Sequence, residues 1–277
     1  MTVASLRELA HDAAASRVGL GAFNVIHLEH ATMFCAAAEE AARPVVLQIS
    51  ENAVKYHGAL EPILAGTLAV ARASSAPVVV HLDHAESPNL VRQAVELGVQ
   101  SVMYDGSHLP DDENRAMTAE LAAFCHDRGV SIEAELGEVG GKNGVHAPGA
   151  RTDPGDAARF VEATGVDLLA VAVGSSHAMS TRDAVLDLEL IARLREAVPV
   201  PLVLHGSSGV SDEGMQAAIR AGMTKINVST HVNKVFTETI RTWLDEHPGV
   251  VDSRKYFTAA STAVVVEVAR LLRLYAS

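Results

Sequence analysis

Histidine side chains follow several of the short apolar segments of this sequence. His84, His177 and His205 each stand just after such a segment, although they lie far apart along the chain. Three imidazoles around one ion, with a fourth position open, form a typical ligand set of catalytic Zn2+. A single histidine in such a place is more often a hydrogen-bonded structural residue. Three histidines in equivalent places favour a shared metal site.

Carboxylates stand near the same segments. Asp83 precedes His84, and the alternation of a β-strand is expected to point Asp83 to the other side of that strand. A carboxylate beside a metal ion but not bound to it is a candidate proton donor or acceptor, although it can also orient a ligating histidine. Asp105 and Glu135 are open to two interpretations: each could bind a second metal position or hydrogen-bond to a ligating histidine. Asp83 is the candidate catalytic acid or base.

Two loops rich in serine and glycine suit an anion. The segments Gly206–Gly209 and Asn227–Thr230 each follow an apolar run and precede a stretch of helical spacing. Backbone N–H groups, hydroxyls and a helix N-terminus can bind phosphate without a net positive charge. Either loop alone is equally consistent with an ordinary serine-glycine turn. Both loops together, beside a metal site, favour phosphate.

The pattern of the whole chain predicts how these residues are positioned. Short β-branched runs alternate with helical stretches such as Asn89–Leu97 and Asp212–Ala221, which is the pattern of a (β/α)8 TIM barrel in one α/β domain. The predicted strands are Gly21–Ile26, Pro44–Ile49, Pro77–Leu82, Gln100–Tyr104, Val130–Glu135, Asp167–Val173, Pro201–Leu204 and Thr224–Val228. The candidate metal and acid residues stand at the ends of the third to seventh strands. Because these ends form the active site of such a barrel, we expect one shared mouth.

The alternative architecture is a doubly wound open sheet. No dinucleotide-type glycine fingerprint follows the first predicted strand, where the sequence reads Gly21-Ala22-Phe23-Asn24, and this argues against that fold. Residues 137–154 form a glycine-dense stretch without a predicted element, and such a loop in a compact domain is often a functional lid. We expect residues 1–277 to form a single domain with a mobile loop at about 137–154.

The composition argues against several classes of partner. Lys and Arg number 22 against 34 Asp and Glu, which gives a net charge of −12 and a pI near 5.5. Nucleic-acid and anionic-membrane binding both draw on clustered basic residues, so neither is expected. Cys35 and Cys125 are the only cysteines and predict no disulfide. The sequence shows no signal-peptide pattern and no apolar run of membrane-spanning length, so we expect a cytoplasmic protein.

Five motifs together give the sequence a family resemblance over nearly its whole length. They are His81-Leu82-Asp83-His84, Tyr104-Asp105-Gly106-Ser107, Glu133-Ala134-Glu135-Leu136-Gly137, His205-Gly206-Ser207-Ser208-Gly209 and Lys225-Ile226-Asn227-Val228. With these motifs, the chain resembles the class II, zinc-dependent ketose-bisphosphate aldolases, which act on fructose or tagatose bisphosphate. No single motif would be specific, but their combination is.

The resemblance implies roles for the residues named above. Zn2+ would bind the three histidines and act as a Lewis acid on dihydroxyacetone phosphate, and Asp83 would handle the proton of the C4 hydroxyl. Asp105 and Glu135 match positions associated with an alternative metal site. The residues implied around the ketose phosphate are Ala178, Gly206, Ser208, Asn227, Ser229 and Thr230. The resemblance also implies a homodimer or homotetramer, and a monovalent cation (Na+ or K+) held by backbone carbonyls.

The chain departs from the family pattern at several positions. Asn143 stands where members usually carry a loop glutamate that exchanges a proton of the ketose phosphate. Thr258 stands where many members have an arginine for the phosphate of the aldehyde half, and Ala178 replaces a common glycine. Residues 50–52, Ser-Glu-Asn, replace a short Gly/Ser loop. These departures concern the aldehyde and the proton exchange, whereas the predicted metal ligands are intact.

The function expected from the sequence is metal-dependent, reversible cleavage of fructose or tagatose 1,6-bisphosphate to dihydroxyacetone phosphate and glyceraldehyde 3-phosphate. One alternative is the same chemistry with a different, unphosphorylated aldehyde. Another is a Schiff-base aldolase with Lys225 as nucleophile, although we favour a structural ion pair for that residue. Outside enzymology, the alternative is a catalytically silent sugar-phosphate-binding protein.

Overall fold

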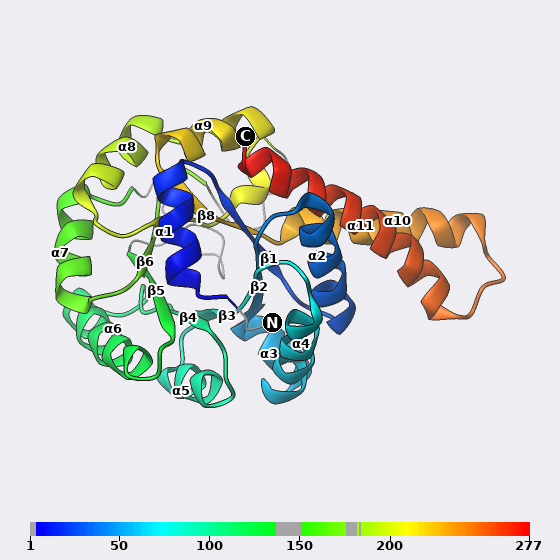
Figure 1. Ribbon diagram of the computed structural model, residues 1–277, viewed down its shortest axis with the longest axis horizontal. Coiled ribbons are helices and arrows are strands. Elements are labelled where there is room, and N and C mark those ends of the chain that lie inside the picture. Colours follow the sequence, from blue (N-terminus) through cyan, green and yellow to red (C-terminus); the bar gives the residue numbers. More distant parts are fainter. Residues whose placement is uncertain (1–3, 137–150, 176–181, 183) are drawn as a thin grey trace.

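Eight parallel strands close into a barrel in the computed structural model (Figure 1), which describes residues 4–136, 151–175, 182 and 184–277. The strands are β1 (Leu20–Asn24), β2 (Val45–Ser50), β3 (Val78–Ala85), β4 (Ser101–Tyr104), β5 (Ser131–Leu136), β6 (Leu168–Val171), β7 (Leu202–Leu204) and β8 (Met223–Val228). Each strand pairs in parallel with the next, and β8 pairs with β1. This closure confirms the predicted (β/α)8 TIM barrel and excludes the open sheet.

Helices alternate with the strands and surround the barrel. In the described ranges they are α1 (Leu6–Ser16), α2 (Leu28–Ala41), α3 (Glu51–His57), α4 (Glu61–Ala73), α5 (Pro88–Glu96), α6 (Asp111–His126), α7 (Pro154–Thr164), α8 (Leu188–Ala197), the 3-10 helix η1 (Ser207–Gly209), α9 (Asp212–Ala221), α10 (Thr230–Glu246) and α11 (Ser253–Tyr275). Several begin at a side chain that caps the first turn, as Ser87 does for α5 and Asp187 for α8. The helices predicted at Asn89–Leu97 and Asp212–Ala221 are confirmed as α5 and α9.

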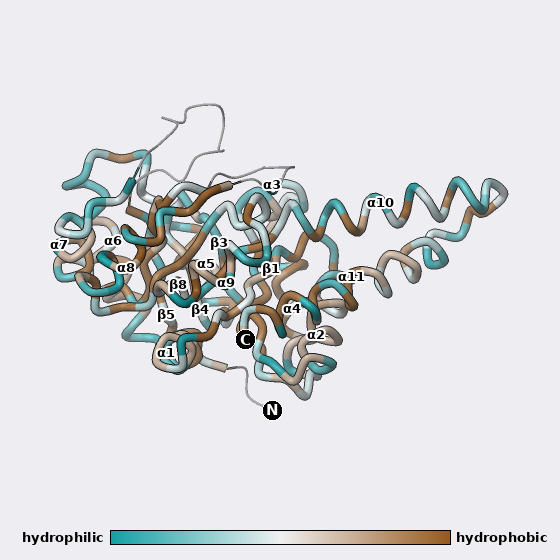
Figure 2. Tube along the Cα trace, turned by 90° about the horizontal axis from the view of Figure 1, so that it is seen from above, coloured by the Kyte–Doolittle hydropathy of each residue, from teal (hydrophilic) through white to brown (hydrophobic). Residues whose placement is uncertain are grey.

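The lower half of the barrel interior is apolar. Alternate residues of a strand point inward, and those nearest the N-terminal ends of the strands form one buried cluster. Its strand residues are Leu20, Ala22, Val46, Val79, Leu168, Ala170 and Val203. Leu6, Ala10 and Ala13 of α1 pack against this cluster, so that α1 closes this end of the barrel (Figures 1 and 2). The amphipathic first helix therefore seals the end of the barrel opposite the predicted active site.

The upper half of the interior is polar, although it is equally buried. The side chains toward the C-terminal ends of the strands are Gln48, His81, Asp83, Glu133, Glu135, His205, Lys225 and Asn227, none more than 8% exposed. Buried polar and charged groups are costly unless they are paired, and their concentration is typical of functional sites. The apolar layer beneath them forms a rigid floor that fixes where these side chains lie.

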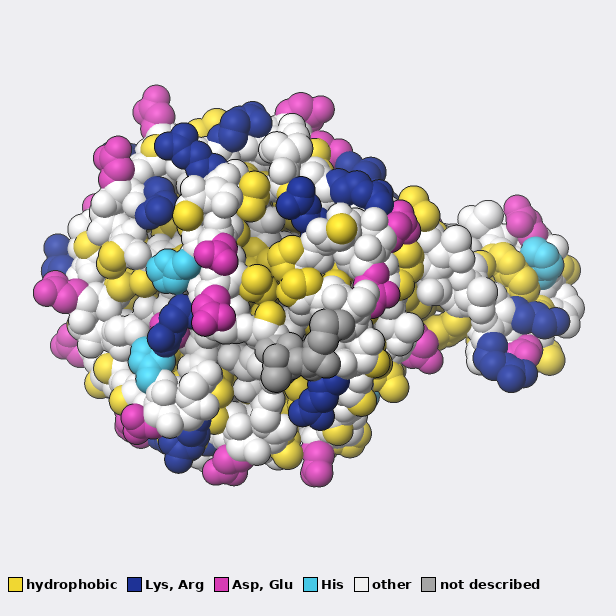
Figure 3. Space-filling model, in the orientation of Figure 1, with side chains coloured by type: hydrophobic (Ala, Val, Ile, Leu, Met, Phe, Trp, Pro, Cys, Tyr) yellow, Lys and Arg dark blue, Asp and Glu magenta, His cyan; other side chains and the backbone are white. Residues whose placement is uncertain are grey.

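The last two helices extend beyond the barrel. α10 and α11 pack together as a pair that projects from one side (Figures 1 and 2), and α11 also packs along α2. Basic and acidic side chains are interspersed on the face of the molecule shown in Figure 3. Among the described residues, no helix combines the length and the apolar character needed to cross a bilayer.

Candidate active site

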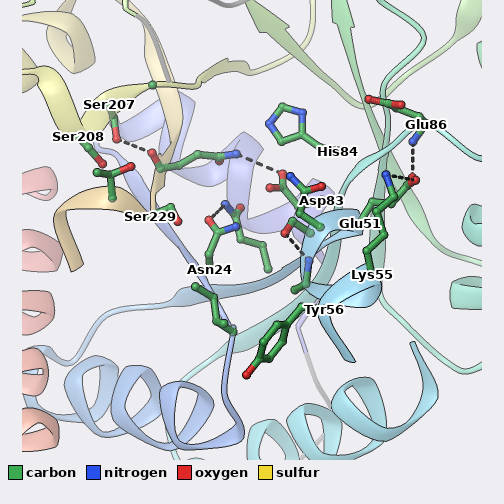
Figure 4. A pocket seen from close by; sticks show the side chains of 18 residues that line it. Asn24, Glu51, Lys55, Tyr56, Asp83, His84, Glu86, Ser207, Ser208 and Ser229 are labelled. Atoms are coloured by element: carbon green, nitrogen blue, oxygen red, sulfur yellow. Dashed lines mark hydrogen bonds and ion pairs between the residues drawn. The ribbon is translucent and has the colours of Figure 1, made fainter. Parts of the chain in front are cut away.

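A pocket of about 550 Å3 opens at the C-terminal ends of the strands (Figure 4). The predicted residues that line it are Asp83, His84, Gly206, Ser208, Asn227, Ser229 and Thr230. Figure 4 shows Ser208 and Ser229 at one side of the pocket and Glu51 and Glu86 at the other. Asp83 and His84 lie between these two sides. The fold therefore brings residues from β3, the loop after β7 and the start of α10 to one cavity.

Asp83 and His84 both line the pocket, which contradicts the strict alternation expected for this strand. His84 has a left-handed backbone conformation with a φ of 48°, and the register between β3 and β4 shifts between Leu82 and Ala85. A non-glycine residue seldom adopts this conformation; the two others in the described ranges, Arg17 and Ala42, end helices α1 and α2, whereas His84 lies in a strand. The irregularity turns His84 to the same side as Asp83. The expectation that Asp83 points to the opposite side was therefore wrong.

Carboxylates hold two of the predicted histidine ligands in place. Nδ1 of His84 lies 3.0 Å from Oδ2 of Asp105, and Nδ1 of His205 lies 3.1 Å from Oε2 of Glu135. The two histidine rings have centroids 4.5 Å apart. Ligand atoms of Asp83, His84 and His205 lie within 4.8 Å of one another, and so do those of His84, Asp105 and Glu135. The described residues thus offer two overlapping sets of metal donors.

The donor atoms fit a divalent metal ion such as zinc. A metal-bound histidine commonly donates its other ring N–H to a carboxylate. In this site Asp105 is positioned to accept that hydrogen bond from Nδ1 of His84. This arrangement assigns Nε2 of His84 to the metal. On His205 both ring nitrogens lie 3.1 Å from a carboxylate, Nε2 from Glu133 and Nδ1 from Glu135, so an ion bound through Nδ1 would replace the contact with Glu135. The third predicted ligand, His177, lies outside the described residues.

Glu133 is a buried site residue that the sequence analysis did not single out. Its Oε2 lies 2.9 Å from Nζ of Lys225, and both side chains are fully buried. Burial alone would raise the pKa of Glu133, but Lys225 and the hydrogen bond with His205 hold it well below its usual value. The ion pair supports the structural role favoured for Lys225 over that of a Schiff-base nucleophile. Strand alternation places Glu133 on the same face of β5 as Glu135, so the sequence already predicted that Glu133 points toward the site.

His205 is likewise surrounded by hydrogen-bonding partners. Burial alone would lower the pKa of His205, but hydrogen bonds with Glu133 and Glu135 raise it to about 9. The backbone oxygen of His205 accepts a hydrogen bond of 2.6 Å from the hydroxyl of Ser175, in the segment that follows β6. The ring of this residue is therefore fixed by β5, and its backbone by the segment that follows β6.

Asp83 is held at the wall of the pocket by a residue of β8 and by a neighbour on its own strand, β3. Its side chain is buried, and its Oδ1 accepts a long hydrogen bond of 3.4 Å from Nδ2 of Asn227 on β8. Nε2 of His81 lies 3.9 Å from the same oxygen. Burial alone would raise the pKa of Asp83, but the nearby His84 and Lys225 lower it. A carboxylate in this position can exchange a proton with a molecule in the pocket.

The loops after β7 and β8 form a cradle opposite the acidic side of the pocket. We call Gly206, Ser208, Ser229 and Thr230 the phosphate cradle. Gly206 has a φ of 67°, a conformation that suits glycine, and leads into η1. Ser229 is the N-cap of α10, and its side chain makes no capping hydrogen bond. The positive end of α10 therefore faces the pocket without a carboxylate cap, as an anion site requires.

Several predicted residues cannot be placed in this pocket. His177, Ala178 and Asn143 lie outside the described residues, and so do residues 137–150 of the predicted loop. Thr258 lies on α11 and lines a separate cavity together with Arg254. The guanidinium of that arginine pairs with Asp252 at 2.8 Å. In this chain, then, neither Thr258 nor Arg254 reaches the pocket that contains Asp83.

The order of strands, the pocket and the paired histidines agree with a known enzyme family. A family model described as "Fructose-bisphosphate aldolase class-II" matches residues 4–277. The chain belongs to this class II aldolase family. It is therefore an aldolase, a carbon–carbon lyase, as the motifs around Asp83 and His205 implied.

Solved structures of aldolases share this architecture over nearly their full lengths. The YdjI aldolase from Escherichia coli K12 is 32% identical, with a TM-score of 0.88, and the match covers 99% of this chain and 97% of that one. A putative fructose-1,6-bisphosphate aldolase from Coccidioides immitis is 29% identical, with a TM-score of 0.87 over 98% and 95% of the two chains. Fructose-bisphosphate aldolase from Campylobacter jejuni is 20% identical, with a TM-score of 0.84 over 99% and 95%, and shows the shared fold alone.

Proposed function

We propose that the protein catalyses reversible, zinc-assisted cleavage of a ketose 1-phosphate or 1,6-bisphosphate to dihydroxyacetone phosphate and an aldehyde. The observation that carries this proposal is the position of Asp83 and His84 between the phosphate cradle and the opposite side of one pocket (Figure 4). A ketose phosphate that spans the pocket, with its C1 phosphate in the cradle, would have the bond to be cleaved beside Asp83.

The residues of the pocket take complementary roles in this proposal. A divalent ion at His84 and His205, with His177 as third ligand, would supply Lewis-acid activation of the ketose carbonyl. Asp83 accepts the proton of the C4 hydroxyl as the C3–C4 bond breaks, and returns it in the condensation direction. Asn227 orients the carboxylate of Asp83 through its Nδ2. The phosphate cradle binds the C1 phosphate with hydroxyls and the first turn of α10.

Two kinds of aldehyde product fit the reaction. Fructose or tagatose 1,6-bisphosphate would give glyceraldehyde 3-phosphate, whereas a ketose with one phosphate would give an unphosphorylated aldehyde. Glu51 and Glu86 line the side of the pocket away from the cradle. Among the described lining residues, Lys55 is the only lysine or arginine, and its Nζ is 3.0 Å from Glu51. The charge of this side favours the unphosphorylated aldehyde, because a second phosphate would meet two carboxylates.

Glu51 keeps its charge where it stands. Burial alone would raise its pKa, but hydrogen bonds from Lys55 and from the backbone N–H of Glu86 lower it. The same carboxylate accepts the N–H of Ser87, so it also ties α3 to the chain that follows β3. Glu51 therefore both fixes the loop beyond His84 and keeps this side of the pocket negative.

The acceptor preference can be measured in the condensation direction. We expect the zinc-loaded protein to join dihydroxyacetone phosphate to glyceraldehyde with a kcat/KM about tenfold or more above that for glyceraldehyde 3-phosphate, because like charges oppose the second phosphate. Replacing Glu86 with glutamine should narrow this ratio of kcat/KM values severalfold. It removes one negative charge but keeps the backbone N–H of residue 86, which donates to Glu51. Glu162→Gln, on the exposed face of α7, is the matched control and should leave the ratio unchanged.

Each result of this panel decides between stated alternatives. If glyceraldehyde 3-phosphate is the better acceptor, the protein is a ketose-bisphosphate aldolase and the charge argument is wrong. If dihydroxyacetone phosphate binds but no aldehyde is condensed, the protein is a silent sugar-phosphate binder. The configuration of the product at C4 separates the fructose from the tagatose series.

Other features of the proposal concern the ion and the assembly. Zinc is supported by the histidine set and by Asp105 and Glu133, which pair with the other ring nitrogens of His84 and His205. We propose a homodimer or homotetramer in the cytoplasm, in keeping with the family resemblance. The monovalent cation stays a prediction.

A further inference from the structure

A network of charged side chains lies behind the phosphate cradle, apart from the residues that line the main pocket. Asp212 accepts hydrogen bonds of 2.6 Å from Arg182 and 2.5 Å from Arg270. Arg270 also donates to both carboxylate oxygens of Glu267, each at 2.8 Å. Nε2 of His231 lies 2.6 Å from Oε1 of Glu267, and since a carboxylate accepts, Nε2 carries the hydrogen. We call these five residues the charged brace.

The members of the charged brace come from segments that follow three consecutive strands. Arg182 follows β6 in the sequence, Asp212 begins α9 after β7, and His231 lies in the first turn of α10 after β8. Glu267 and Arg270 stand on α11, the last helix of the chain. Arg182 also donates a hydrogen bond of 2.9 Å to the backbone oxygen of Val210. Helix α11 is thereby tied to the chain behind the C-terminal ends of β6, β7 and β8.

His231 joins the brace directly to the phosphate cradle. Its backbone N–H donates a hydrogen bond of 3.2 Å to Oγ of Ser208, while its side chain points to Glu267. The hydroxyl of Ser207 donates to the backbone oxygen of Asn227, which links the same two loops a second time. Of these two links, the one through His231 also reaches α11, so this residue contacts both the cradle and the last helix.

The strength of these contacts suits a positioning role. The side chain of Glu267 is 19% exposed and accepts two parallel hydrogen bonds from one guanidinium, a geometry that is stronger and more directional than an exposed ion pair. Burial alone would raise the pKa of Glu267, but hydrogen bonds from Arg270 and His231 lower it to about 2, so the carboxylate stays charged near neutral pH. None of the five residues is needed for the chemistry assigned to Asp83.

We propose that His231 and Glu267 are positioning residues, which hold the first turn of α10 against Ser208 and thereby set the geometry of the phosphate cradle. The proposal rests on the proposed function, because it takes the cradle as the site of the ketose phosphate. It assigns to the C-terminal helix a part in substrate affinity, although α11 contributes no residue to the pocket of this chain.

The test is to replace His231 with alanine and to measure dihydroxyacetone phosphate binding to the zinc-loaded protein by calorimetry. The variant keeps the backbone N–H but loses the link to Glu267. We expect the Kd to rise on the order of tenfold, since small displacements of positioned groups weaken binding and catalysis strongly. The KM for the ketose phosphate should rise by a similar factor, with kcat changed less than about twofold, which is the pattern of lost uniform binding.

Three further variants separate positioning from stability alone. Glu267→Gln keeps an oxygen that accepts the His231 hydrogen bond and should retain most of the affinity, whereas Glu267→Leu should behave as His231→Ala does. Arg273→Gln removes another ion pair of α11, with Glu40 at 3.1 Å, and should leave the Kd unchanged. If His231→Ala and Arg273→Gln bind dihydroxyacetone phosphate equally well, the positioning proposal is wrong. If the unmutated protein itself does not bind it, the proposed function fails instead.

Discussion

Replacing His205 with alanine is expected to remove metal binding and to lower turnover below detection. The imidazole is fully buried, and its Nδ1, the nitrogen that would bind the ion, lies 3.1 Å from Oε2 of Glu135, while Nε2 pairs with Glu133. Without it, Glu133 and Glu135 also lose a shared hydrogen-bonding partner in the barrel interior. Zinc content measured by mass spectrometry, beside the aldol cleavage rate, should show both losses together.

A second ligand variant and a control make the His205 result specific. His84→Ala should lose metal and turnover in the same way, and because His84 is partly exposed, it disturbs the buried polar layer less. His11→Ala, on the exposed face of α1, should keep both properties. Thermal unfolding of each variant shows whether the fold persists. A folded His205→Ala protein that retains one zinc ion and a normal rate would contradict the assignment.

Replacing Asp83 with alanine should remove turnover but, unlike replacing His205, should leave metal binding intact. The carboxylate lies beside His84 but has a different task, because it exchanges the proton of the C4 hydroxyl as the carbon–carbon bond breaks. Removing a general acid or base typically costs about 10²–10⁴ in rate, and we expect kcat to fall within that range. Zinc content and dihydroxyacetone phosphate binding should stay within about twofold of the unmutated protein, because the metal and phosphate sites remain.

Comparing Asp83→Asn with Asp83→Ala separates the proton-transfer role of the carboxylate from its shape. Asp83→Asn keeps the shape of the side chain but cannot accept the proton, so its kcat should fall as far as that of Asp83→Ala. Asp127→Ala, at the exposed end of α6, serves as control and should keep full activity. A near-normal kcat for Asp83→Asn would exclude the acid/base role and leave Asp83 with a purely orienting one.

Much of this architecture could be predicted from periodicity. The eight apolar runs, the helical spacing between them and the rule that active sites lie at the C-terminal strand ends placed His84 and His205 at one mouth. These features can be predicted from local sequence, because the same strand–helix pattern repeats along the chain. The structure brings the two histidines to a ring distance of 4.5 Å, although they are far apart in the chain.

The deviations came from features that local patterns do not encode. The irregular end of β3 depends on a left-handed His84, a conformation that is uncommon for any non-glycine residue and that periodicity does not predict, so the alternation rule failed for Asp83. The contact between His231 and Glu267 joins residues on different helices, and its existence depends on how α11 packs against the barrel. Glu133 differs from these cases, because its place on the inner face of β5 was predictable and was overlooked.

The family resemblance supplied roles that spacing alone left open. Asp105 and Glu135 had two equally physical interpretations, and the structure shows both of them hydrogen-bonded or ion-paired to histidines while also contributing to a second group of donor atoms. The acidic side of the pocket is formed by Glu51, in the segment 50–52 that departs from the family pattern, and by Glu86, which follows β3. Such loops vary most in this fold and set its specificity.

The most direct test of the metal site is an anomalous difference map at the zinc absorption edge from crystals of the zinc-loaded protein. We predict one strong peak per chain in the pocket, about 2.0–2.1 Å from ring nitrogens of His84, His177 and His205. A peak bound only by Asp105 and Glu135, or three rings too far apart to share one ion, would contradict the account.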